Sequence, residues 1–115
     1  GSMRASLQGF VEYLKKSNIP LSECFFILGD MNELGENAPR LHQEIGQYLK
    51  NLGVSEVAFI GRFSEHYSRG FGDSKNIFDS KKSFEKDWDF ISKKFKYFFI
   101  KASRSLQLES ILDIN

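Results

Sequence analysis

The chain has 115 residues, 41% of them hydrophobic and 15% aromatic, and its 16 basic and 15 acidic residues leave a formal net charge of +1. This length supports one hydrophobic core and not two, so we expect a single domain over residues 1–115. The balanced charge offers no electrostatic attraction for nucleic acid or an anionic membrane. No apolar run approaches the roughly 20 residues that span a bilayer, and the one cysteine, Cys24, has no internal disulfide partner. These features favour a cytoplasmic protein, and we expect a monomer.

The first half of the chain predicts a helix, a strand and a second helix. Residues 3–17 carry apolar side chains at the spacing of an amphipathic helix, namely Leu7, Phe10, Val11 and Leu14. The apolar run at residues 24–29 predicts a strand that is buried on both faces. After an acidic loop, Asn37 has the side chain of an N-cap, Pro39 suits a first helical turn, and Gly53 suits a C-cap.

The second half continues the alternation of strands and helices. We expect a strand at residues 54–60, a short helix at 62–69, a brief strand at 76–78, a helix marked by Phe84, Trp88, Ile91 and Phe95, and a strand at 97–101. A last helical turn would pack Leu108, Ile111 and Leu112. Strands and helices in alternation imply parallel pairing, so the pattern predicts an α/β fold: a three-layer Rossmann-like sandwich with a mainly parallel sheet.

Polar residues follow two of the predicted strands at their carboxyl ends. The stretch after the first strand holds two glycines, Gly29 and Gly35, and the acids Asp30 and Glu33. The last strand is followed by Lys101, Ser103 and Arg104. Because the carboxyl edge of an open parallel sheet is where ligands collect, we expect both groups to face one crevice.

The same residues carry a resemblance to a known family. Residues 28–35 read Leu-Gly-Asp-Met-Asn-Glu-Leu-Gly, and His42 follows on the next predicted helix. Residues 101–109 have a lysine, a serine, an arginine and a glutamate in register with a second motif, with Ala102 and Ser105 in place of its two glycines. The chain therefore resembles the C-terminal domain of the Mur ligases over essentially its whole length. The closest resemblance is to the branch that adds D-alanyl-D-alanine to the UDP-N-acetylmuramoyl-tripeptide of peptidoglycan synthesis.

The resemblance implies a share in an ATP-dependent peptide ligation. In that family ATP and Mg²⁺ act in the full-length enzyme together with a central and an N-terminal domain, and the C-terminal domain brings in the dipeptide and closes over the nucleotide. This chain has no Gly-x-x-x-x-Gly-Lys-Ser/Thr loop, so we expect it to be inactive alone and to bind neither cofactor tightly. The family's domain begins with a strand just before the first helix, so that strand is expected to be missing. Residues 1–2 or 1–3 are equally compatible with an expression-tag remnant and with native sequence.

The resemblance also selects candidate site residues. Lys101 and Arg104 would hold the dipeptide carboxylate or neutralise phosphate charge, with a hydroxyl from Ser103. Asp30 and Glu33 would receive the incoming ammonium group or contact the central domain, or else form a solvated acidic turn that caps the next helix. His42 is a candidate for catalysis, although a lone helical histidine more often packs or caps. Gly29 and Gly35 would serve backbone geometry.

Two other functions remain open at this point. One is a related ligase of the same superfamily, such as another Mur enzyme or a folylpolyglutamate synthase. The other is a free-standing α/β binding module without a catalytic partner domain. Neither Gly61-Arg62-Phe63 nor Gly70-Phe71-Gly72 forms a dinucleotide fingerprint, and His66 has no companions at metal-ligand spacing, so we expect no metal site.

Overall fold

The computed structural model describes residues 2–32, 35–72, 76–102 and 110. Its strands are β1 (Cys24–Gly29), β2 (Val57–Ile60), β3 (Ile77–Phe78) and β4 (Tyr97–Lys101). Its α-helices are α1 (Ser2–Lys16), α2 (Ala38–Leu52), α3 (Ser64–Phe71) and α4 (Lys81–Lys94), and two short 3₁₀ helices, η1 (Leu21–Glu23) and η2 (Gly35–Asn37), lie beside β1 and α2.

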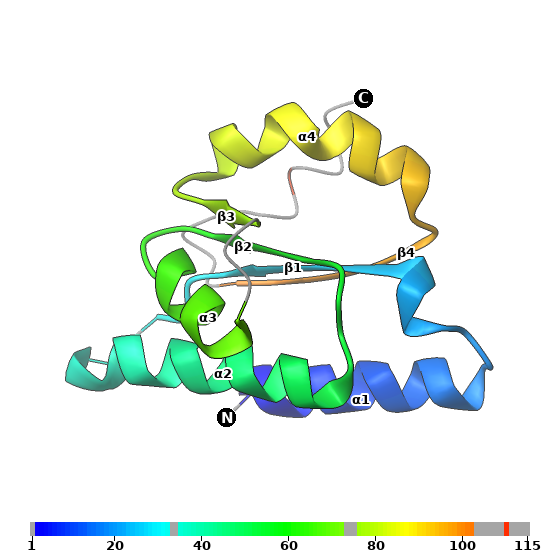
Figure 1. Ribbon diagram of the computed structural model, residues 1–115, viewed down its shortest axis with the longest axis horizontal. Coiled ribbons are helices and arrows are strands. Elements are labelled where there is room, and N and C mark those ends of the chain that lie inside the picture. Colours follow the sequence, from blue (N-terminus) through cyan, green and yellow to red (C-terminus); the bar gives the residue numbers. More distant parts are fainter. Residues whose placement is uncertain (1, 33–34, 73–75, 103–109, 111–115) are drawn as a thin grey trace.

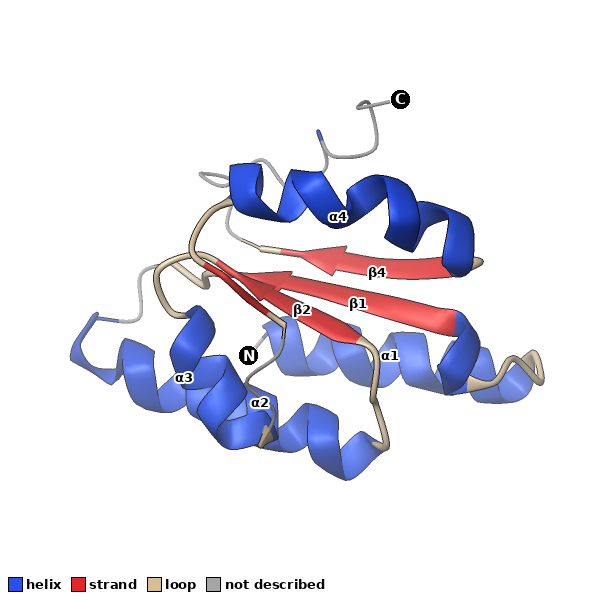
Figure 2. Cartoon of the chain, turned by 45° about the horizontal axis from the view of Figure 1, so that its top comes forward, coloured by secondary structure: helices blue, strands red, loops and turns tan. Residues whose placement is uncertain are grey.

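The four strands form one sheet in the order β3-β2-β1-β4, and every pair is parallel (Figure 2). In register, Leu28 of β1 lies between Phe59 of β2 and Lys101 of β4. The carboxyl ends of these three strands therefore lie at one edge of the sheet, as expected for an α/β fold. Helices alternate with the strands of this parallel sheet, so the predicted α/β fold class is confirmed.

The helices make a layer on each face of the sheet. Figure 1 shows α4 on one side, and α1, α2 and α3 on the other. The side chains of β1 alternate accordingly: Phe26 and Leu28 belong to the core beneath α1 and α2, whereas Phe25 and Ile27 belong to the core beneath α4. Two apolar cores thus hold one sheet, because successive strand residues point to opposite faces.

Two glycines allow α2 and α3 to lie very close together. A Cβ on Gly46 of α2 would be 2.0 Å from the carbonyl oxygen of Tyr67, and a Cβ on Gly70 of α3 would be 1.9 Å from the carbonyl oxygen of Gln43. Each helix therefore places a glycine against the backbone of the other. No larger residue fits at either position without separating the helices.

Several element boundaries differ from those expected. The second strand begins at Val57 and not at 54, because the Val54 amide still bonds the Leu49 carbonyl in the cap of α2. Gly53 closes that helix in the left-handed conformation, with φ of 92°, as predicted. Asn37 does precede α2, but its side chain makes no capping hydrogen bond. The predicted helix at 62–69 lies at 64–71, and the expected last turn, at Leu108, Ile111 and Leu112, falls outside the described residues.

The outer edge of β4 is unpaired among the described strands. Helices α1 and α2 lie on the same face of the sheet, and connections between parallel strands are right-handed. The connection from an earlier strand through α1 to β1 would therefore run in the same direction across the sheet as the connection from β1 through α2 to β2. Such a strand would lie on the side of β1 away from β2, beyond β4. The expected missing first strand remains a prediction, and this edge is the position that the topology offers it.

Candidate functional site at the carboxyl edge of the sheet

The carboxyl ends of β1, β2 and β4 bring together the residues that sequence analysis selected and some that it did not. Asp30 follows β1 directly, Gly61 and Arg62 follow β2, and Lys101 is the last residue of β4. A chain segment at the end of each strand therefore contributes to one edge. The chemistry of the edge depends on which of these groups are already engaged.

Asp30 is bound to backbone amides of the neighbouring loop. Its Oδ2 accepts a hydrogen bond from the Arg62 amide at 3.0 Å, and its Oδ1 accepts one from the Phe63 amide at 2.9 Å. These amides precede the first turn of α3, where a negative charge is stabilised by the helix dipole. Asp30 thus caps the turn before α3, the helix that follows the neighbouring strand β2. One expectation was a cap of the next helix in sequence, α2, and these hydrogen bonds are made elsewhere.

Gly61 is the residue that lets this contact form. It has φ of 117°, and a Cβ at this position would lie 2.5 Å from Asp30 Oδ2. Only glycine combines that backbone angle with so close an approach of a carboxylate. A glycine directly after a buried strand predicts a turn at Gly61, but the contact with Asp30 could not be predicted from the local sequence.

His42 connects the loop after β1 to α2. The side chain is fully buried, its Nδ1 lies 2.6 Å from the Ala38 carbonyl oxygen, and its Nε2 accepts a hydrogen bond from the Met31 amide at 2.9 Å. Since the carbonyl can only accept, the proton lies on Nδ1 and the ring is neutral. Burial lowers the pKa of His42, and the nearby Asp30 carboxylate opposes that shift only in part.

Tyr67 of α3 completes the attachment of the loop. Its hydroxyl donates a 2.7 Å hydrogen bond to the Gly29 carbonyl, and burial raises its pKa, so it stays protonated. Gly29, Asp30 and Met31 are therefore held one after another by Tyr67, by the amides that precede α3, and by His42. We call this set of hydrogen bonds the loop clasp. Tyr67 could not be predicted as part of the site, because nothing in the sequence around it distinguishes it from a core aromatic residue.

An aromatic column supports the loop clasp from the core outward. The Phe63 ring stacks on His42 at 4.4 Å, His42 meets Tyr67 edge-on at 4.9 Å, and Tyr67 stacks on Phe59 of β2 at 4.9 Å. The Arg62 guanidinium carbon lies 5.2 Å from the centroid of the Phe63 ring. The column thus begins at a buried strand residue and ends at an exposed cation.

The remaining predicted residues are only partly described. Lys101 is half-buried, and within the described part of the chain no hydrogen bond or ion pair of its ammonium is recorded. Gly35 has the left-handed φ of 59° expected of a structural glycine, whereas Gly29 is an ordinary strand residue that contributes its carbonyl. Three predicted binding residues, Glu33, Ser103 and Arg104, lie outside the described residues.

The described residues contain no cluster of side chains that forms a metal site. No group of three or more His, Cys, Asp and Glu side chains there is arranged to hold a metal ion. The sequence contains no phosphate-binding loop of the Gly-x-x-x-x-Gly-Lys-Ser/Thr type. In the same described portion, no helix has the length and apolar content needed to traverse a bilayer.

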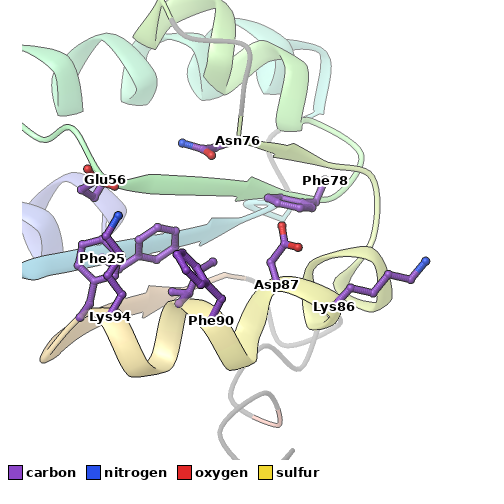
Figure 3. A pocket seen from close by; sticks show the side chains of 10 residues that line it. Phe25, Glu56, Asn76, Phe78, Lys86, Asp87, Phe90 and Lys94 are labelled. Atoms are coloured by element: carbon purple, nitrogen blue, oxygen red, sulfur yellow. The ribbon is translucent and has the colours of Figure 1, made fainter.

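A hollow of about 390 Å³ lies at the opposite edge of the sheet, between α4 and the strand starts (Figure 3). Its apolar lining is Phe25, Phe78, Phe90, Ile91 and Phe95, and its polar lining is Glu56, Asn76, Lys86, Asp87 and Lys94. None of the residues selected from the sequence contributes to it. The hollow is therefore separate from the carboxyl edge and shares no group with the loop clasp.

Comparison with known proteins places the chain beside one group of ligases. No protein-family model matches it. It is 32% identical over 113 residues to the UDP-N-acetylmuramoyl-tripeptide–D-alanyl-D-alanine ligase of Rickettsia prowazekii (strain Madrid E), a match that covers 94% of this chain and 24% of that protein. The ligase of the same name from Buchnera aphidicola subsp. Acyrthosiphon pisum (strain APS) is 32% identical over 88 residues, covering 76% of this chain and 19% of that protein.

Solved structures agree with this similarity. A crystal structure of MurF from Acinetobacter baumannii matches with a TM-score of 0.68 at 22% identity, which supports the fold, over 78% of this chain and 21% of that one. The MurF ligase from Thermotoga maritima, solved in complex with ADP, matches with a TM-score of 0.59 at 28% identity, over 80% of this chain and 21% of that one. The chain thus spans about a quarter or less of the relatives it matches.

Proposed function

This chain belongs to the Mur ligase family, and from that premise we propose that it is the C-terminal domain of a longer ATP-dependent ligase that adds D-alanyl-D-alanine to UDP-N-acetylmuramoyl-tripeptide. The observation that carries the proposal is the 32% identity over 113 residues to a ligase of that name. The domain would contribute dipeptide binding and closure over the nucleotide in a cytoplasmic, monomeric enzyme. Closure of this kind excludes water from a hydrolysable acyl phosphate and orients the attacking amine.

We assign the carboxyl edge of the sheet to ligand binding. Lys101 is a half-buried residue whose ammonium has no recorded partner in the described chain, which suits a carboxylate or phosphate ligand. Ser103 and Arg104 follow it in the same motif and would act with it. Glu33 is the acid of the first loop that we propose for the incoming ammonium group.

Asp30 and His42 have a different part in this proposal. Both carboxylate oxygens of Asp30 and both ring nitrogens of His42 are engaged in hydrogen bonds. We therefore propose that they are positioning residues, which fix the start of the loop that carries Glu33 and Gly35. A neutral, doubly bonded His42 has no free nitrogen with which to accept a substrate proton.

ATP and Mg²⁺ would be held mainly by another part of the longer protein. That proposal rests on the lack of a phosphate-binding loop in this sequence and on the length of the relatives, of which this chain matches about a quarter. The strand expected before α1 would come from the same longer chain and pair with the outer edge of β4. This chain alone is then expected to be inactive.

The test is to express the protein from its longer reading frame and measure ADP release. We expect ADP release that requires both D-alanyl-D-alanine and the UDP-linked tripeptide, with the 115-residue chain as the inactive control. ADP release that depends on the tripeptide but on a different amino acid would identify another ligase of the superfamily. A reading frame with no ATP-binding part would leave a binding module and refute the proposal.

Lys101→Ala tests the assigned site in the longer protein. We expect the KM for D-alanyl-D-alanine to rise about tenfold, since a charge-assisted hydrogen bond contributes about 1.5–3 kcal/mol, while the KM for the UDP-linked tripeptide hardly changes. Lys96→Ala, at an exposed lysine before β4, is the matched control. An unchanged dipeptide KM in Lys101→Ala would remove Lys101 from the site.

A further inference from the structure

Three nitrogen-bearing side chains lie along the outer surface of α3 and its entry, beside the carboxyl edge. They are His66 and Arg69, three residues apart on one side of α3, and Arg62 in the turn before it, whose guanidinium and the His66 ring both lie near the Phe63 ring. Arg62 and Arg69 are exposed, and His66 is half-buried. None of the three has a part in the loop clasp through its side chain.

The Arg62 side chain is positioned by its hydrogen-bonded backbone and by the Phe63 ring. The Arg62 backbone amide is bound by Asp30, and the side chain lies over Phe63, which is stacked on the buried His42. No hydrogen bond or ion pair of the guanidinium is recorded in the described part of the chain. An arginine held against an aromatic ring keeps its donors free for a planar oxyanion and loses less conformational entropy on binding.

His66 is oriented by Arg69. The Arg69 Nη1 lies 3.3 Å from His66 Nδ1, and a guanidinium can only donate, so Nδ1 accepts and the ring proton lies on Nε2. The His66 ring lies 6.0 Å from the centroid of the Phe63 ring, and the Arg62 guanidinium carbon 5.2 Å from the same centroid. Two sets of donors therefore border one aromatic ring at the surface.

Two acids among the described residues bear on these donors, Asp30 and Glu65. The Asp30 carboxylate accepts hydrogen bonds from two backbone amides, and Glu65, an exposed acid of α3, makes no recorded ion pair with Arg62. His42, which stacks on Phe63, is neutral. Within the described part of the chain, therefore, no carboxylate forms an ion pair with Arg62 that an incoming anion would have to displace.

We propose that Arg62, His66 and Arg69 form an oxyanion-binding surface that takes a phosphate or carboxylate group of a ligand at the carboxyl edge. Arg62 follows β2 and Lys101 ends β4, so β1 alone separates their strands, a spacing of about 10 Å. That spacing suits a ligand with two anionic groups, one for each cation. The assignment of the ligand to the ligase reaction rests on the proposed function, but oxyanion binding itself does not.

The experiment is an NMR titration of the 115-residue chain with inorganic phosphate at constant ionic strength, followed at the Arg62 Nε–H and the His66 ring. We expect saturable shifts at both, a Kd about tenfold higher in Arg62→Gln, and a smaller loss in Arg69→Gln, which frees the His66 ring. Arg40→Gln is the control, because Arg40 is an exposed arginine of α2 that pairs with Glu44. A well-dispersed spectrum checks that each variant remains folded.

Parallel titrations with acetate and with D-alanyl-D-alanine identify the source of the group. Saturation by phosphate alone assigns a phosphate group, and saturation by the carboxylates assigns a carboxylate. Shifts that do not saturate, or equal weakening by Arg40→Gln, would overturn the proposal. Saturable phosphate binding by the 115-residue chain, together with no ligase activity in the longer protein, would retain this site and refute the proposed function. An active longer ligase with no anion shift at Arg62 would refute this site and retain the proposed function.

Discussion

The two edges of the sheet differ in how their polar groups are held. At the carboxyl edge, Asp30, His42 and Tyr67 make hydrogen bonds of 2.6–3.0 Å to backbone groups of neighbouring segments. At the amino edge, a hollow of about 390 Å³ has charged side chains around it, but Phe90 is 68% exposed. The hollow therefore lies at the edge of the sheet opposite the loop clasp.

The volume of a hollow is therefore not enough to identify a binding site. Specific binding needs donors and acceptors that are already oriented, because each side chain ordered on binding costs free energy. The loop clasp and the aromatic column provide this order next to Lys101 and Arg62. On the α4 side, in contrast, the buried Trp88 Nε1 has no hydrogen-bond partner within the described chain.

The largest expected effect is at the crossing of α2 and α3, on which the loop clasp depends. Gly46→Ala places a Cβ 2.0 Å from the Tyr67 carbonyl oxygen, so we expect the free energy of unfolding to fall by about 3 kcal/mol or more. Urea denaturation measures it. Gly9→Ala is the matched control, because Gly9 is an exposed residue of α1 with no atom near its Cβ position, and there stability should rise by about 0.5–1 kcal/mol.

Removal of the His42 side chain should weaken the loop clasp at its centre. His42→Ala leaves the Met31 amide without its acceptor and opens a buried space, so we expect a loss of about 2–3 kcal/mol in the free energy of unfolding. Amide exchange at Met31 should accelerate by more than the global destabilisation explains. Equal acceleration in α4 would contradict a local role.

The pH dependence of stability gives a second measure of His42. Burial lowers the pKa of His42 below its ordinary value of 6.5. At a pH between the native and the unfolded pKa, His42 is therefore protonated in the unfolded chain and neutral in the native state. The stabilisation of the native state by neutral His42 is fully present above about pH 6.5 and is lost as the pH falls through the native pKa. We expect the unfolding free energy to fall less between pH 7.5 and 5 in His42→Ala than in the wild type, as urea titrations at each pH would measure.

A smaller effect is expected at Asp30. Asp30→Asn retains one acceptor oxygen but removes the charge that two amides and the start of α3 stabilise, so the unfolding free energy should fall by about 1 kcal/mol. Asp89→Asn is the control, since Asp89 makes an exposed pair with Lys93 and should change stability by no more than about 0.5 kcal/mol. Equal losses in thermal denaturation would show that the cap at α3 is unimportant.

The smallest effect is expected at the amino edge. Phe90→Ser alters a side chain that is 68% exposed, so the unfolding free energy should change by no more than about 0.5 kcal/mol. A loss above 1 kcal/mol would mean that the hollow is part of the packed core, and the contrast between the two edges would then fail.

Much of the architecture could be predicted from the sequence, because the spacing of apolar residues indicates which side chains of a helix or strand are buried. The apolar run at Cys24 to Gly29 is a strand buried along its whole length, and the spacing of Leu7, Val11 and Leu14 produced the expected helix with those residues buried. Boundaries were less accurate where a cap intervened. Val54 belongs to the end of α2, and α3 begins two residues later than expected because Asp30 fixes the preceding turn.

The site was predictable only in its location. Alternation of strands and helices placed Asp30 and Lys101 at one edge, because parallel strands end together. It did not reveal that the Asp30 carboxylate is bound by the neighbouring loop, nor that Tyr67 and Gly61 belong to the same arrangement. These contacts join residues more than 30 positions apart, and no local pattern encodes them.

The sequence by itself thus determined the alternating elements, the family and the edge at which chemistry is expected, because hydrophobic period and local motifs are properties of neighbouring residues. Only the tertiary structure decided which groups at that edge are free and which are engaged. It committed His42 and Asp30 to the loop clasp and left the ammonium of Lys101 and the guanidinium of Arg62 without a recorded partner in the described chain. The physical reason is that a hydrogen bond depends on the distance between two atoms, and the fold alone sets that distance for residues far apart in sequence.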